Sequence, residues 1–208
     1  MAGALIEGLT FSGATQAHER YLDAHCNGRT EPFAAELFAR SAHRGATVID
    51  GGAYLGFYAL LAARRIGSDG TVFAFEPNPE TFEMLRRNVS ENGLEDQVVP
   101  LSGECSDLDA TLDARPVDLV RLDLGGGEVE ALRGMRRTLA SSPDPCLIVD
   151  CGPSALARAR TSPRTLLREL DAAELEVYAI DDQHWELHPI DEVPVAGGGH
   201  LKLYCRRP

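Results

Sequence analysis

The 208-residue sequence lacks long apolar runs and has no concentration of positive charge. No window approaches the roughly 18 continuous apolar residues that a membrane-spanning helix needs. The first residues offer neither a basic region nor a sustained apolar stretch, so we expect no signal peptide, a cytoplasmic chain and no membrane partner. The net charge of −12 leaves no basic patch of the kind that binds phosphates, so we also expect no nucleic-acid partner.

The cysteines indicate neither a disulfide framework nor a zinc site. There are five of them, an odd count, in a chain without a visible export signal, which favours reduced thiols packed as small apolar groups. Cys146 and Cys151 do not have the spacing of structural zinc ligands, and no suitably spaced pair of histidines completes a site. We therefore expect no structural metal.

The stretch Thr47–Tyr58 is typical of a strand, a tight glycine turn and a helix start. Its glycines allow positive φ and a close approach of a ligand to the backbone. The spacing of Asp50, Gly52 and Gly56 is not the dinucleotide pattern G-x-G-x-x-G, and the Lys-Ser/Thr pair of a phosphate-binding loop is missing. The stretch predicts a small-molecule cradle without saying which molecule it holds.

Strand-like and helix-like segments alternate from residue 47 onward, which predicts an α/β fold with a doubly wound, mostly parallel sheet. The expected strands are 47–50, 71–76, 97–101, 117–124 and 146–150, followed by 175–180 and 200–205 as a terminal hairpin. The expected helices are 55–66, 80–90, 128–139 and 162–173. Residues 1–46 form a helical leader, a candidate cover for the site, with helices over 14–24 and from Thr30, the expected N-cap, onward; residues 47–208 form the main domain.

Carboxylates stand at or beside the ends of most expected strands, where parallel sheets bind their ligands. These residues are Asp50, Glu76, Asp123 and Asp150, and Glu104 follows shortly after the third expected strand. A carboxylate after the second strand suits a ribose, whose two hydroxyls can both donate to it. The alternative for Glu76 is a cap on the following helix, and for Asp123 and Asp150 it is a hydrogen bond to loop amides.

Taken together, the motifs resemble those of the FkbM-type S-adenosylmethionine-dependent methyltransferases over about residues 30 to 149. The matching segments are Glu31-Pro32, Val48–Tyr58, Val72–Asn78, Asn88, Val117–Asp123 and Glu128–Gly134. The resemblance implies a Rossmann-like methyltransferase fold whose seven-stranded sheet ends in an antiparallel hairpin. It also implies S-adenosylmethionine as the cofactor and S-adenosylhomocysteine as its product.

The same resemblance implies which residues contact the cofactor. Asp50, Gly52 and Gly56 would border its methionine part, Glu76 its ribose hydroxyls, and Glu104 its adenine amine, with Asp123 near the sulfonium. The full implied set is Glu31, Asp50, Gly52, Ala53, Tyr54, Gly56, Glu76, Pro77, Asn78, Gly103, Glu104, Cys105 and Asp123. A rim of carboxylates matches a cofactor of net positive charge.

Three positions depart from the pattern of that family. Gly125 stands where the family commonly has an acidic residue, whereas Glu128 keeps the second acidic position. Arg121 replaces the usual lysine, and Tyr54 replaces a frequent asparagine. These departures leave most residues expected to contact the cofactor unchanged and mainly affect the region where the methyl acceptor would bind.

We expect O-methylation of a small hydroxylated metabolite or natural product, in which the chain aligns and desolvates the acceptor. An alcohol acceptor benefits from a general base. Our assigned catalytic residues are Asp123, Glu128 and His25, with His18 and Asp150 as further candidates. A homodimer is one assembly that we consider.

Two alternatives stay open. The chain could bind S-adenosylmethionine without transferring its methyl group. It could instead resemble the catechol-type enzymes, with Asp123 and Asp150 as metal ligands, although Cys151 stands where such enzymes would have an Asn ligand and Mg²⁺ prefers oxygen. An NAD-dependent oxidoreductase is disfavoured by the glycine spacing.

Overall fold

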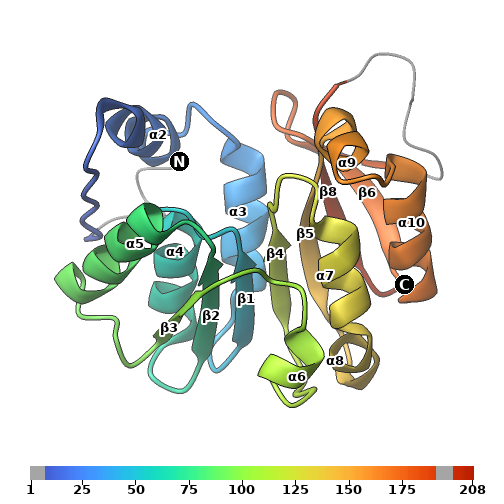
Figure 1. Cartoon of the computed structure of the whole chain (residues 1–208), viewed down its shortest axis with the longest axis horizontal. Helices are drawn as coiled ribbons and strands as arrows, with labels where there is room; N and C mark the ends of the chain where they lie inside the picture. Colours follow the sequence, from blue (N-terminus) through green and yellow to red (C-terminus); the bar gives the residue numbers. More distant parts are fainter. Residues whose placement is uncertain (1–7, 191–198) are drawn as a thin grey trace. The chain divides into compact units, whose positions relative to one another are not determined.

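The computed structural model describes residues 8–190 and 199–208. The chain divides into two compact units, Met1–Glu104 and Cys105–Pro208. Figure 1 colours the chain by sequence and labels its helices and strands. No helix in the described part of the chain has the length and apolar character to cross a membrane.

The first unit contains three parallel strands in the order β3-β2-β1. Glycines and prolines end or begin its helices: Pro32 and Pro79 lie in first turns, and Gly67 follows a last turn. Its elements are α2 (Gln16–Cys26), α3 (Pro32–Ser41), β1 (Thr47–Gly51), α4 (Phe57–Ile66), β2 (Thr71–Glu76), α5 (Pro79–Glu91) and β3 (Val98–Ser102).

Strand β1 and helix α4 form the core of the first unit. Val48, Ile49, Leu60 and Leu61 have no exposed surface, and burial of each such side chain contributes roughly 1.5–3 kcal/mol. Registers pair Gly51 with Phe75 and Glu76 with Ser102, so the carboxyl ends of the three strands lie at one edge of the sheet. The helices of the expected leader, α2 and α3, belong to this unit, and their role as a cover stays a prediction.

The second unit begins with two parallel strands and ends with three antiparallel ones, in the order β4-β5-β8-β6-β7. Its elements are α6 (Leu108–Thr111), β4 (Leu119–Leu122), α7 (Glu128–Gly134), α8 (Arg136–Ser141), β5 (Cys146–Cys151), α9 (Pro153–Arg158), α10 (Pro163–Ala172), β6 (Glu176–Asp181), β7 (Glu186–Pro189) and β8 (Leu201–Arg206). Because β8 is antiparallel to β5, Asp150 pairs with Lys202 and Cys151 with Leu201. The start of β8 therefore lies at the carboxyl end of β5.

The α/β alternation and the antiparallel end are confirmed, but the expected count of seven strands is wrong. The described residues contain eight, because β7 lies in the long connection between the strands that we expected at 175–180 and 200–205. Asp181 accepts from the main-chain N–H groups of Gln183 and His184 and tightens the turn before β7. In β7 only Leu187 is strongly apolar, so no alternating pattern identified this short strand.

Two helix predictions also differ from the structure. The helix expected over 128–139 is broken at Met135, whose φ of −122° and ψ of 19° are not helical. Gly134, just before the break, has no room for a side chain, because a Cβ there would lie 1.9 Å from the carbonyl oxygen of Ser106. The expected N-cap Thr30 is wrong by one residue. Glu31 is the N-cap of α3, with a left-handed φ of 51° and no side-chain cap.

Candidate functional site

The glycine turn after β1 is held against the end of β2. The N–H groups of Gly52 and Ala53 both donate to the carbonyl oxygen of Phe75, at 3.0 and 2.9 Å. Gly52, Tyr54 and Gly56 all have positive φ values. At Gly56 a Cβ would also lie 2.8 Å from Leu85 Cδ1, so both backbone and packing require glycine there. Asp50, at the end of β1, is fully buried.

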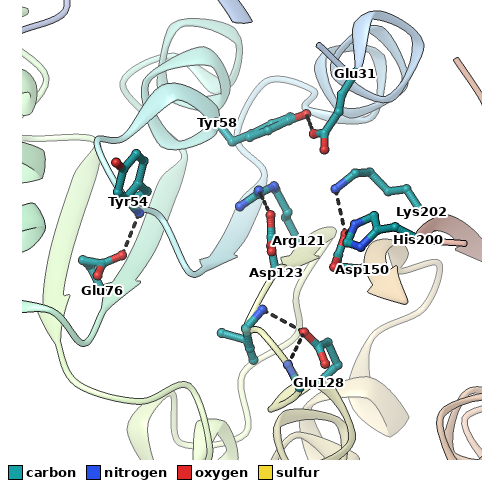
Figure 2. Close-up of polar contacts among 12 residues, drawn as sticks. Glu31, Tyr54, Tyr58, Glu76, Arg121, Asp123, Glu128, Asp150, His200 and Lys202 are labelled. Carbon is teal, nitrogen blue, oxygen red and sulfur yellow. Dashed lines mark hydrogen bonds and ion pairs between the residues drawn. The ribbon is translucent and has the colours of Figure 1, made fainter. Parts of the chain in front are cut away.

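Three hydrogen bonds orient the carboxylate of Glu76. Its Oε1 accepts from the N–H of Asn78 at 3.0 Å and from Thr81 Oγ1 at 2.8 Å. Its Oε2 accepts from the N–H of Tyr54 at 2.8 Å (Figure 2). A carboxylate has about four acceptor positions, so this arrangement leaves capacity for a further donor. The cap on α5 is made by Asn78, whose Oδ1 accepts from Glu80 and Thr81, and Glu76 is therefore not needed for that purpose.

The remaining implied cofactor residues of the first unit lie nearby along the chain. Pro77 separates Glu76 from the capping Asn78. Gly103, with a φ of 135°, donates to the carbonyl oxygen of Glu76 at 3.2 Å, and a Cβ there would meet nothing within 4 Å. Glu104 ends the unit. Cys105 is buried in the second unit, and the approach of 102–105 to an adenine stays a prediction.

The leader helices pack on the glycine turn through aromatic side chains. His18 and Tyr21 lie edge-on to Tyr54, with ring centroids 5.5 and 4.7 Å away. His25 is buried, contacts the ring of Phe57 at 5.1 Å, and donates through Nδ1 to the carbonyl oxygen of Tyr21. This is the environment of a packing histidine, and its expected role as a base stays a prediction.

Glu31 contacts the first turn of α4 from the start of α3. The hydroxyl of the buried Tyr58 donates to its Oε2 at 3.0 Å (Figure 2). Glu31 belongs to the implied cofactor set, whereas we expected no role for the side chain of Tyr58.

Asp123, at the end of β4, pairs with a cation two residues earlier. Arg121 Nη2 donates to its Oδ2 at 2.7 Å, and the side chain of Asp123 is 39% exposed against 5% for Arg121. The partly exposed carboxylate is held by a buried guanidinium. Alternating residues of a strand share a face, which explains the pairing.

Glu128, the first residue of α7, organises the three-glycine loop. Its Oε1 accepts from the N–H groups of Leu124 and Gly126, at 2.9 and 3.2 Å, and its Oε2 has no hydrogen-bond partner among the described residues. Burial raises the pKa of this carboxyl, and the negative charge of Asp150 raises it further. Gly125 has a φ of 60° and open space at its Cβ. Glu128 thus shapes the loop, and its expected catalytic role stays a prediction.

Asp150 lies at the end of β5 between two cations that sequence reasoning missed. Its Oδ1 lies 2.6 Å from His200 Nε2 and 3.2 Å from Lys202 Nζ (Figure 2). Burial raises the pKa of Asp150, and Lys202 opposes that shift. Burial also raises the pKa of the Cys151 thiol to about 11. Only antiparallel pairing of β8 with β5 identifies His200 and Lys202 as neighbours of Asp150.

The residues of the first unit fit the chemistry of S-adenosylmethionine. Glu76 has spare acceptor capacity that would suit ribose hydroxyls, and Asp50 is a buried carboxylate that would suit an ammonium group; both contacts stay predictions. Across residues 8–190 and 199–208, no three His, Cys, Asp or Glu side chains gather as a metal site.

A family model, the TRM5/TYW2 methyltransferase domain, matches residues 34–120 of the chain. No curated protein sequence matches it.

Solved structures match over most of the chain. One, a protein from Clostridium thermocellum assigned as an rRNA-methylase, has a TM-score of 0.62 at 16% identity, covering 84% of this chain and 92% of its own. Another, assigned as an O-methyltransferase from Klebsiella pneumoniae, has a TM-score of 0.59 at 16% identity, covering 100% and 90%. A SAM-dependent O-methyltransferase from Thermotoga maritima has a TM-score of 0.56 at 18% identity and covers 86% of this chain, which spans 64% of that protein.

The structural neighbours show a fold, and the family model, which matches less than half of the chain, indicates a methyltransferase domain. Sequence identities below 25% do not indicate the substrate. The matching model is not that of the FkbM family, so that membership stays a prediction. The chain has the α/β Rossmann-like fold of class I methyltransferases, and the findings support S-adenosylmethionine as its cofactor and methyl transfer as its activity.

Proposed function

We propose that this chain is an S-adenosylmethionine-dependent O-methyltransferase that acts on a small hydroxylated metabolite. The observation that carries the proposal is the orientation of Glu76 by three donors from two segments. A carboxylate with both oxygens positioned in advance binds a vicinal diol with little ordering cost. Such a diol is what the ribose of the cofactor presents.

The first unit holds the cofactor in this proposal. Glu76 accepts from the ribose hydroxyls, Asp50 binds the ammonium group, and the backbone at Gly103 and Glu104 borders the adenine. When bound, S-adenosylmethionine supplies an electrophilic methyl group on a sulfonium. The chain contributes alignment of the acceptor and exclusion of water, which are the main sources of rate in such a displacement.

The reaction in this proposal needs no metal ion. A catechol-type site would use Asp123 and Asp150 as ligands, but Asp150 already has the ammonium group of Lys202 3.2 Å from its Oδ1. A divalent cation at the same oxygen would repel that ammonium group. Methyl transfer that is lost in EDTA and restored by Mg²⁺ would overturn this part of the proposal.

An RNA acceptor is the second candidate, favoured by the similarity to the protein assigned as an rRNA-methylase. The net charge of −12 opposes it, because binding to phosphates depends on clustered Lys and Arg. Incorporation of a labelled methyl group into total RNA, falling steeply with salt, would support this candidate. Incorporation into hydroxylated small molecules with little dependence on salt supports the first.

Calorimetry followed by product mass tests the proposal in two steps. We expect S-adenosylmethionine and S-adenosylhomocysteine to bind and NAD not to bind. A panel of phenols, sugars and polyols is then incubated with the cofactor, and one acceptor is expected to gain the mass of a single methyl group. Binding without transfer to any acceptor, RNA included, would favour a cofactor-binding protein, the alternative to which Gly125 points.

A further inference from the structure

Tyr54 is a bulky residue in a strained backbone conformation. Its φ is 52°, in the left-handed region, where Gly and Asn are common and bulky residues are rare. A residue persists in such a conformation where its surroundings hold it, and such residues cluster at functional sites. The N–H of Tyr54 donates to Glu76 Oε2 at 2.8 Å, so this backbone conformation helps to orient the carboxylate (Figure 2). The contacts that hold Tyr54 therefore also affect Glu76.

One face of α2 packs against the ring of Tyr54. The ring centroids of His18 and Tyr21 lie 5.5 and 4.7 Å from that of Tyr54, and both rings meet it edge-on, with interplanar angles of 86° and 79°. Edge-to-face pairs at such distances are favourable beyond the area that they bury. His18, Tyr21 and His25 recur at helical spacing, so they lie on the same face of the helix. α2 thus contacts the glycine turn through the side chain of Tyr54.

Both rings of α2 that contact Tyr54 are themselves oriented by neighbours. His18 is buried, and its Nδ1 accepts from the N–H of Ala14 at 3.2 Å. The ring of Tyr21 lies 4.1 Å from that of the buried His25. The two rings therefore restrict the side chain of Tyr54, and a restricted side chain limits the movement of its backbone.

The phenol of Tyr54 is compatible with a neighbouring carboxylate. Burial raises the pKa of Tyr54, and the negative charge of Glu76 raises it further. The ordinary pKa of a tyrosine is already about 10, so this side chain is neutral at physiological pH and does not repel the carboxylate. The contact between α2 and the turn is therefore one of aromatic packing.

We propose that His18 and Tyr21 of α2 are positioning residues for cofactor binding. They act through Tyr54 on the carboxylate of Glu76, and together the four residues form a relay from α2 to the end of β2. All four belong to the first unit, so the relay lies within one compact body. The inference rests on the proposed contact of Glu76 with the ribose hydroxyls.

The relay acts by ordering Glu76 before the ribose arrives. While the rings of α2 hold Tyr54, its N–H stays directed at Oε2, and a carboxylate that is already ordered binds at a lower cost in entropy. Without those rings the strained backbone of Tyr54 relaxes, and Glu76 loses one of its three donors. The α2 rings thus affect cofactor affinity without contacting the cofactor.

A double-mutant cycle separates the relay from a direct contact of α2 with the cofactor. Tyr21→Ala removes one ring, and titration calorimetry is expected to show that S-adenosylhomocysteine binds about twofold to tenfold more weakly, the factor that corresponds to one aromatic pair. Tyr54→Asn removes the ring that receives the contact but keeps the N–H and a residue type that tolerates the left-handed region. In the Tyr54→Asn background, Tyr21→Ala is expected to cause no further loss of affinity.

Two results of the cycle overturn the relay. Equal weakening by Tyr21→Ala in both backgrounds would mean that α2 affects the cofactor by another route. Wild-type affinity in Tyr21→Ala would mean that the ring contact has no effect on Glu76, even if urea unfolding shows that the variant is less stable.

Tyr21→Phe and Phe11→Ala are the matched controls. Tyr21→Phe keeps the ring and is expected to bind S-adenosylhomocysteine as the wild type does. Phe11→Ala removes a different aromatic contact near the N-terminus, with the ring of Phe57 at 5.9 Å, and is expected to leave the affinity unchanged. A loss in Phe11→Ala as large as in Tyr21→Ala would indicate a general effect of the N-terminal residues and overturn the relay.

Hydrogen exchange measures the same coupling from the side of α2. Coupling between two sites is reciprocal, so S-adenosylhomocysteine is expected to slow the exchange of the amides of α2 in the wild type. In Tyr54→Asn these amides are expected to exchange equally fast with and without the ligand. Protection of α2 by the ligand in Tyr54→Asn would contradict the relay.

Failure of the proposed function gives a different result. Equal affinity of the wild type and Glu76→Gln for S-adenosylhomocysteine overturns the ribose contact and the relay together. Tyr21→Ala with wild-type affinity overturns the relay alone. Methylation of carbon, nitrogen or sulfur overturns the proposed O-methylation and leaves the relay standing, because none of its measurements uses an acceptor.

Discussion

The carboxylate of Glu76 accepts the main-chain N–H of Tyr54 at 2.8 Å, across 22 residues of sequence. This contact joins the glycine turn after β1 to the end of β2. Tyr54 has a φ of 52°, which costs a non-glycine residue free energy. The hydrogen bond to a charged acceptor offsets part of that cost, since such bonds contribute about 1.5–3 kcal/mol.

Glu76→Gln is expected to weaken the binding of S-adenosylhomocysteine about tenfold to a hundredfold, the factor that corresponds to one charge-assisted hydrogen bond. The amide would also point an N–H at one of the donors that now bind the carboxylate. Titration calorimetry measures the change. The control is Glu80→Gln, an exposed glutamate on the following helix. Equal affinities in the two variants would contradict the assigned contact with ribose.

Gly56→Ala is expected to lower the free energy of unfolding by about 2–5 kcal/mol. The positive φ of 91° contributes one part, and the contact of a Cβ with Leu85 and Leu60 contributes the other. Gly45→Ala isolates the first part, because Gly45 has a φ of 76° and nothing within 4 Å of its Cβ position. Urea unfolding measures both. If Gly45→Ala lowers the free energy of unfolding as much as Gly56→Ala does, the contacts of the added Cβ with Leu85 and Leu60 have no effect on stability.

Glu128 is expected to make stability depend on pH in a specific direction. Burial raises the pKa of Glu128 above its ordinary 4.5, so the folded chain holds this proton more tightly than the unfolded chain. The resulting stabilisation is complete below about pH 4.5 and is lost as pH rises through the raised value. Glu128→Gln removes the titration. Urea unfolding from pH 4 to 7 measures the free energy of unfolding of the wild type minus that of Glu128→Gln. This difference is expected to fall as pH rises. A rising difference would contradict the raised pKa of Glu128.

Asn88 is expected to hold the N-terminal segment against α5. Its side chain is fully buried, accepts from the N–H of Ser12, and donates to the carbonyl oxygens of Ser12 and Leu55. Asn88→Ala leaves the carbonyl oxygen of Leu55 without this donor, at a cost of about 1–3 kcal/mol. Asn92→Ala removes only the contacts of the half-buried Asn92 with Thr10 and Asn88, and is expected to cost less than 1 kcal/mol. Limited proteolysis near residue 12 should be faster in Asn88→Ala than in Asn92→Ala.

Much of the first unit follows from local patterns. The apolar run at 47–50, the glycines after it, and Pro79 after Asn78 each act within a few residues, and their elements form where expected. The break between α7 and α8 does not follow from such a pattern. It adjoins Gly134, where Ser106 passes too close for a side chain, and no pattern inside the helix predicts a contact with a segment 28 residues earlier.

The sequence by itself determined the α/β alternation, the glycine turn and the carboxylates at the strand ends, because hydrophobic period, turn chemistry and capping are local properties of the chain. Only the tertiary structure decided what those carboxylates contact. Tyr54 reaches Glu76, Tyr58 reaches Glu31, and His200 with Lys202 reaches Asp150 through the pairing of β8 with β5. Strand pairing and side-chain contacts across tens of residues depend on how the chain packs, so local sequence patterns do not predict them.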